Sequence, residues 1–165
     1  ISQCAISENT TGDSLRLELS QLSSPLLIQT IERLVNDQTY PEQQDDTNAN
    51  YAHKLKKSEA LIDWQENAEH IALRVRAFNS SNLLTFDYDN TRIKVWQAEV
   101  CQHNTAGNAG EITQLDKTGL YVNCGKGVLR ITQLQLPGKK PVDIAALLNG
   151  RSGWLTTGAV LSENS

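Results

Sequence analysis

The sequence predicts an α+β chain: a short helical segment, then a connector, then a small strand-rich domain with flanking helices. Apolar residues recur at helical spacing within the first 36 residues, whereas after Phe78 they alternate with polar ones, which is the period of strands. The charge also changes along the chain. Residues 1–50 hold two basic against eight acidic residues, and residues 51–165 hold 13 basic against 11 acidic residues. An acidic helical part is therefore expected before a slightly basic β part.

Two short amphipathic helices are predicted in the first part. The first is expected to begin at Asp13, whose carboxylate can accept from free amides of the first turn. The second is expected to restart at Ser24-Pro25, because serine suits the cap and proline the first helical position. Their apolar faces comprise Leu15, Leu19, Leu22, Leu27, Ile31, Leu34 and Val35. Helices this short have little stability alone, so we expect them to need another packing partner.

Residues 36–50 are polar and predict an extended surface connector. The following segment, Tyr51–Trp64, carries three lysines and then ends on apolar residues that predict docking onto a domain. The lysines are Lys54, Lys56 and Lys57. Two interpretations remain open for them: solvated linker charges, which are the common case, or a basic seam on which a polyanion lies.

A helix is predicted at about 65–77, opened by an Asp63/Glu66 capping arrangement. A β-hairpin should follow, with Asp89-Asn90 as its turn, because both residue types tolerate positive φ. In that register Asp87 faces Arg92 on the side of the sheet that also carries Lys94 and Trp96. This face suits nucleic acid by charge and stacking, although an ordinary solvated sheet face with one half-buried tryptophan is the more common case.

Three more strands and a last helix are predicted after the hairpin. The turn Gly125-Lys126-Gly127 lacks the GxxxxGK-Ser/Thr pattern and leads into a strand, so it predicts a hairpin turn and not a phosphate loop. The helix is expected to begin at Pro141 and to end at Asn149-Gly150. The strands are expected at about 111–115, 120–124 and 128–136, with a further short strand possible in the tail. Such a set fits a five- to six-stranded OB-like β-barrel.

Several classes of function find no support in the sequence. The three histidines lie on a linker, a helix and a loop without a nucleophile or carboxylate at catalytic spacing, so no catalytic residue is assigned. The three cysteines are far apart, which favours free thiols in a reducing compartment over disulfides or a metal site. No apolar run reaches the roughly 18 residues of a membrane span, and no secretory leader is visible. We expect a cytoplasmic protein without membrane or metal, and Ile1 suggests a fragment or a processed product.

Five segments carry a resemblance: YAHKLKKSEALIDW (51–64), RAFN (76–79), IKVWQAEV (93–100), GLYVNCGKGVLRITQLQLPGKKP (119–141) and DIAALLNGR (143–151). In this order and spacing they resemble the C-terminal part of the bacterial methionyl-tRNA formyltransferase family. The leucine pattern from Leu15 to Leu34 is also similar to the last helices of that family's Rossmann-like formyltransferase domain. The resemblance therefore runs nearly end to end.

The resemblance implies residues 1–36 as the end of the Rossmann-like domain, 37–62 as a linker, and 63–165 as an OB-like domain that holds initiator methionyl-tRNA. The formyl donor of the complete enzyme would be 10-formyltetrahydrofolate. This portion is expected to bind no cofactor and no metal, and to be monomeric. The residues expected to contact tRNA are Lys54, Lys56, Lys57, Arg74, Arg76, Arg92, Lys94, Lys139, Lys140 and Arg151.

The sequence also departs from the family. RAFN is followed by SSNLL where the family has a Pro-Trp-Pro-Gly-like run, and Leu61 stands where the family carries an arginine. The family's catalytic Asn and His pair, its Ser-Leu-Leu-Pro loop and its catalytic Asp have no counterpart in these residues. Two alternatives remain: the C-terminal domain of another folate-dependent formyltransferase or hydrolase, and a non-catalytic OB-type binding module.

Overall fold

The computed structural model describes residues 1–79, 81–101, 107–151 and 153–161. The chain forms two compact units, residues 1–55 and residues 56–165. No helix among the described residues combines the length and the apolar character needed to cross a membrane.

The first unit is built on a single long helix, α1 (Gly12–Val35). The prediction of two helices that restart at Pro25 is wrong, because the helix continues through this proline. Proline has no amide hydrogen, so the carbonyl four residues earlier, that of Gln21, lacks its usual helical donor. Just ahead of Pro25, the hydroxyls of Ser23 and Ser24 both donate to the Ser20 carbonyl, at 3.1 and 3.2 Å. The cap also differs from the prediction, since Thr11 and not Asp13 accepts from the Ser14 amide.

No residue of α1 is buried. The apolar residues Leu17, Leu27 and Ile28 of the helix are each about 60% exposed. The helix is followed by an extended, exposed connector that contains one short turn, η1 (Asp46–Asn48). The expected extended connector is therefore confirmed. In the part of the chain that the structure describes, the helix face has found no packing partner.

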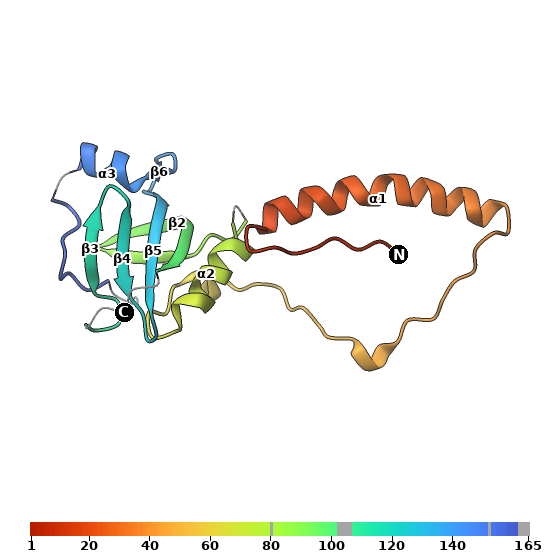
Figure 1. The fold of residues 1–165 in the computed structure, drawn as a ribbon, viewed down its shortest axis with the longest axis horizontal. Helices are drawn as coiled ribbons and strands as arrows, with labels where there is room; N and C mark the ends of the chain where they lie inside the picture. The colour runs from red at the N-terminus through yellow and green to blue at the C-terminus, as the bar shows by residue number, and fades with distance from the viewer. Residues whose placement is uncertain (80, 102–106, 152, 162–165) are drawn as a thin grey trace. The chain divides into compact units, whose positions relative to one another are not determined.

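The second unit holds an antiparallel sheet that curls into a half-barrel (Figure 1). Its hydrogen-bonded order is β1-β2-β5-β4-β3, and β6 adds to β5 outside this path. The strands are β1 (Thr85–Tyr88), β2 (Thr91–Cys101), β3 (Ile112–Asp116), β4 (Gly119–Asn123), β5 (Val128–Gln135) and β6 (Val142–Asp143). The predicted α+β class and OB-like sheet are confirmed, and the strand bounds lie within two residues of those expected.

The predicted hairpin between β1 and β2 has the expected register. Phe86 pairs with Ile93 and Asp87 pairs with Arg92. Asp89 and Asn90 form the turn with φ values of 49° and 55°. These left-handed values match the right-handed twist of the strands, which is why short polar residues occupy the turn.

The helix α2 (Ala68–Ala77) packs against β2 and β5 (Figure 1). It begins three residues later than predicted, because residues 63–66 form a separate turn. The Asp63 carboxylate accepts from the Gln65 amide at 2.8 Å inside that turn, and Asn67 caps the helix instead. The predicted inward face is confirmed, since Ile71 and Val75 are buried.

The last helix, α3 (Ile144–Gly150), also begins later than predicted. Residues 142–143 are drawn into β6, which pairs with β5, so Pro141 lies outside the helix. The Asp143 carboxylate accepts from the Gln133 side-chain nitrogen Nε2 at 3.2 Å and makes no capping bond. Among residues 153–161 the tail contributes a single antiparallel bridge from Val160 to Glu111 and no longer strand.

The predicted docking of the joint's apolar end is confirmed. Ile62 and Trp64 are 2% and 1% exposed, and Phe86 lies edge-on to Trp64 with 5.9 Å between ring centroids. The Ile62 amide donates to the Thr85 carbonyl at 2.9 Å, which ties the joint to the first strand. Side chain and backbone together fix this segment on the sheet.

A close backbone contact holds the same segment from the other side. The turn of residues 125–127 joins β4 to β5, as predicted, and lies against the residues before α2. The Gly125 amide donates to the carbonyls of Trp64 and Glu66 at 2.8 and 3.0 Å. A Cβ atom on Gly125 would lie 1.9 Å from the Gln65 carbonyl oxygen. Only glycine allows this approach.

Gly125→Ala should therefore lower the free energy of unfolding by about 1–3 kcal/mol, because backbone and not a flexible side chain must move to admit the methyl group. Urea denaturation of both proteins measures the loss. Gly150→Ala is the matched control, since no atom lies within 4 Å of a Cβ at that position. Equal denaturation midpoints for the wild type and Gly125→Ala would contradict this interpretation.

Candidate nucleic-acid interface

The three joint lysines lie on both sides of the boundary between the two units. Lys54 belongs to the first unit. Lys56 and Lys57 belong to the second, where Lys57 begins the short helical turn η2 (Lys57–Ala60). All three are exposed, and none forms an ion pair with a carboxylate in the part of the chain that the structure describes. Their charges are available to an anionic partner.

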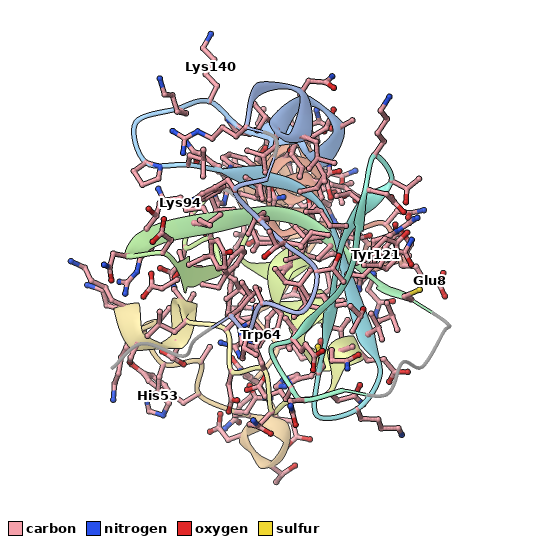
Figure 2. All side chains as sticks on the ribbon, turned by 90° about the vertical axis from the view of Figure 1, so that its left-hand side faces the viewer. Glu8, His53, Trp64, Lys94, Tyr121 and Lys140 are labelled. Atoms are coloured by element: carbon pink, nitrogen blue, oxygen red, sulfur yellow. The ribbon has the colours of Figure 1, made fainter. Side chains whose placement is uncertain are left out.

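A second group of basic residues is connected to Trp96 through Gln135. Lys94 lies opposite Gln135 in the β2–β5 ladder. The Gln135 side chain accepts from the Trp96 indole N–H at 3.0 Å and donates to the Lys139 carbonyl at 2.7 Å. Lys94, Trp96, Gln135, Lys139 and the adjacent Lys140 form what we call the basic face. Its lysines are exposed, and Lys140 extends away from the domain into solvent (Figure 2).

The position of Trp96 depends on an irregularity in β2. The pairing of β2 with β5 shifts between Val95 and Gln97, so Trp96 is the extra residue of a bulge. The Asn79 side chain donates to the Trp96 carbonyl at 3.0 Å. Bulges change the direction of side chains next to functional sites. Here Trp96 is held through both its backbone carbonyl and its indole nitrogen. Sequence reasoning found Trp96 but missed Asn79 and Gln135, because the pairing that brings them together spans distant segments.

The arginines in the predicted set are engaged within the protein. Arg74 binds Glu66 through two contacts of 3.0 and 3.1 Å. Arg92 binds Asp87 through two contacts of 3.0 Å, and this bonding raises the pKa of Arg92. Arg151 lies over the Trp154 ring, 5.4 Å from its centroid. Arg76 is half-buried on α2. The structure thus separates the exposed lysines of the predicted set from arginines that already have partners.

The rest of the outer sheet surface is neutralised by its own pairs. Arg130 binds Glu99, and hydrogen bonding to Tyr121 and then to Glu99 raises the pKa of Arg130. In the β3–β4 turn, hydrogen bonds from Thr118 and Gln114 lower the pKa of Asp116 to about 2. This region offers an anion less net positive charge than the basic face.

The Asp116 bonding predicts a pH dependence confined to acid. Its pKa is lowered on folding from 3.8, so the stabilisation is present above pH 3.8 and is lost as the pH falls toward 2. Thr118→Val removes the largest cause and should raise the Asp116 pKa toward 3.8, as followed by carboxyl NMR titration. Thr156→Val, a change at an exposed distant position, should leave it unchanged. An Asp116 pKa near 3.8 in the wild type would contradict the bonding.

No cluster of three or more His, Cys, Asp or Glu side chains that could hold a metal ion occurs among the described residues. His53 lies beside Tyr51 with 4.7 Å between ring centroids, and His70 contacts Glu66 on a solvated face of α2, while His103 falls outside the described residues. No disulfide joins Cys4, Cys101 or Cys124, and burial raises the pKa of the Cys124 thiol to about 11, which makes it unreactive at neutral pH.

Comparison with known sequences places these features in a family. Residues 54–152 match the family described as "Formyl transferase, C-terminal domain". The whole chain is also 43% identical to the methionyl-tRNA formyltransferase of Pseudoalteromonas translucida (strain TAC 125), over 167 aligned residues. It covers 52% of that relative, so the chain spans about half the length of the curated relative it matches.

Solved structures of HypX from Aquifex aeolicus have a similar fold. One variant aligns with a TM-score of 0.64 at 16% identity, covering 87% of this chain and 27% of HypX. HypX in complex with tetrahydrofolic acid aligns with a TM-score of 0.57 at 15% identity, covering 84% of this chain and 26% of that protein. At this level of identity the likeness concerns the fold alone.

Proposed function

The chain belongs to the formyl transferase C-terminal domain family, and from this premise we propose that it is the tRNA-holding portion of a methionyl-tRNA formyltransferase. The observation that carries the proposal is the 43% identity to such an enzyme along the entire chain. The same identity favours the tRNA enzyme over another folate-dependent formyltransferase or hydrolase. It also disfavours a non-catalytic OB-type module, because a relative that shares the whole chain is an enzyme.

The basic residues support this function by their chemistry. Lysine is a flexible point charge that suits phosphate and reads bases poorly, so the exposed lysines would position tRNA without selecting its sequence. Trp96 adds an aromatic surface beside Lys94 for stacking or apolar contact. In this proposal the exposed joint lysines and the basic face make the direct contacts. The paired Arg74 and Arg92 contribute less than the sequence suggested.

The remaining parts of the proposal follow from the family. Residues 1–36 would end the catalytic, Rossmann-like domain, 37–62 would link the domains, and 63–165 would form the tRNA-binding domain. The exposed apolar face of α1 would pack within that catalytic domain. Formyl transfer to initiator methionyl-tRNA from 10-formyltetrahydrofolate would occur there, during translation initiation in the cytoplasm. We assign no residue of this chain to the folate and derive no chemical step through it.

The purified 165-residue chain should therefore transfer no formyl group to methionyl-tRNA. No counterpart of the family's catalytic Asn, His and Asp set is assigned in this sequence, so we expect the chain to have no groups for the chemical step. The assay follows formyl-methionyl-tRNA formation with 10-formyltetrahydrofolate as donor, and the full-length relative from P. translucida is the positive control. Turnover that depends on the chain itself would show that its residues include a catalytic centre.

Replacing Lys54 and Lys57 with alanine should weaken tRNA binding by similar factors for initiator and elongator tRNAs. For every phosphate contact that the substitutions remove, the plot of log affinity against log salt should flatten by about 0.9. Stability should change by less than about 0.5 kcal/mol, because the side chains are exposed. Binding of labelled tRNA is measured at several salt concentrations.

Lys117→Ala is the matched control for this experiment. It removes one exposed lysine from the β3–β4 turn, outside the joint segment, and should change neither affinity nor salt dependence. If the double variant behaves like this control, the joint lysines are merely solvated linker charges. The basic face would then have to carry the interaction by itself.

A further inference from the structure

The backbone that follows the second-unit joint lysines is held by side chains at three successive carbonyls. Arg74 donates to the Glu59 carbonyl and, at 3.4 Å, to the Leu61 carbonyl. The Thr85 hydroxyl donates to the intervening Ala60 carbonyl at 3.3 Å. Side chains from α2 and β1 thus bind the backbone at the end of η2.

The turn itself is closed at its other end. The Lys56 amide donates to the Glu59 carboxylate, and the Glu59 amide donates to the Lys56 carbonyl at 3.1 Å. Lys56 and Lys57, at the start of this turn, are exposed to solvent. The segment that carries the lysines is therefore ordered by contacts that do not use their ammonium groups.

Arg74 is fixed on its far side by Glu66. The two guanidinium–carboxylate contacts measure 3.0 and 3.1 Å, and the Arg74 side chain is only 17% exposed. His70 also contacts Glu66, at 3.1 Å. The Glu66 carbonyl is in turn bound by Gly125 of the sheet. A continuous series of contacts runs from the sheet through Glu66 and Arg74 to the lysine-bearing turn.

We propose that Arg74 is a positioning residue for the tRNA interface: it holds residues 56–61 so that Lys56 and Lys57 are presented in a fixed place. This inference rests on the proposed function. Arg74 does not contact the nucleic acid, because its fork is divided between a carboxylate and two backbone carbonyls. Ordering the turn before binding lowers the entropy that the lysines lose when they meet phosphate.

The guanidinium is required for this arrangement. Its planar fork presents several donors in fixed directions, so it can bind Glu66 and the two carbonyls at the same time. A lysine at position 74 keeps the positive charge but has one nitrogen to place. Charge and geometry can therefore be separated by substitution.

The experiment compares Arg74→Lys, Arg74→Ala and Glu66→Gln in the 165-residue chain, with tRNA affinity measured at several salt concentrations. We expect both Arg74 variants to lose about five- to tenfold in tRNA affinity at 0.1 M salt. The reason is that one phosphate contact changes the affinity by about eightfold between 1 M and 0.1 M salt. Glu66→Gln should also lower the tRNA affinity. It serves as the test variant if Arg74→Ala does not fold.

A double-mutant cycle gives the readout that a general loss of stability would not. In a Lys56→Ala/Lys57→Ala background, Arg74→Lys should cause no further loss, because the lysines that it positions are gone. Amide exchange at Glu59 and Leu61 should also quicken in Arg74→Lys, while β4 and β5 keep their protection. These results together would support the inference.

Other outcomes would overturn it. Full affinity in Arg74→Lys with a loss in Arg74→Ala would mean that Arg74 acts by charge, as a direct phosphate contact. Equal losses in the presence and absence of Lys56 and Lys57 would also refute positioning. Variants that bind like the wild type would refute the inference alone. A wild-type chain that does not bind tRNA would instead overturn the proposed function, and with it the role of Arg74.

Discussion

The backbone contact between Gly125 and the segment before α2 is the constraint on which the β domain depends. The Gly125 amide donates to the carbonyls of both Trp64 and Glu66. The Gln65 carbonyl occupies the space that a side chain on residue 125 would need. This contact holds residues 64–66, the segment that leads into α2. It also seats Trp64 in the core, so that the chain enters the domain at one defined place. The joint that precedes Trp64 is consequently anchored at its end.

The pattern of charge pairing determines which basic residues remain available. Arginines at 74, 92 and 130 each bind a carboxylate in the same domain, whereas the lysines of the joint and the basic face do not, among the described residues. The difference has a physical origin. The guanidinium fork matches a carboxylate in two contacts and is weakly hydrated, while the ammonium group is strongly hydrated and stays in water. A surface rich in free lysine offers phosphate binding that depends strongly on salt.

Two helix boundaries differ from those that the sequence predicts. Pro25 was expected to divide the first helix, yet α1 continues through it. The last helix was expected from Pro141, yet pairing with β5 draws residues 142–143 into a strand. In both places the residue types favour the predicted boundary. At residues 142–143 the pairing with β5 decides otherwise.

The sequence by itself determined the α+β class, the hairpin with its register, the strand order along the chain and the family. These features are local, since alternation, turn residues and short motifs are written within a few residues of one another. Only the tertiary structure decided which basic residues are free and which are bound. Asp87 and Arg92 could be paired from the hairpin register. The bonds of Arg74 to the carbonyls of residues 59 and 61, and of Trp96 to Gln135, could not. Their partners lie 13 to 39 residues away along the chain. Only the packing of α2 on the sheet and the pairing of β2 with β5 bring them together.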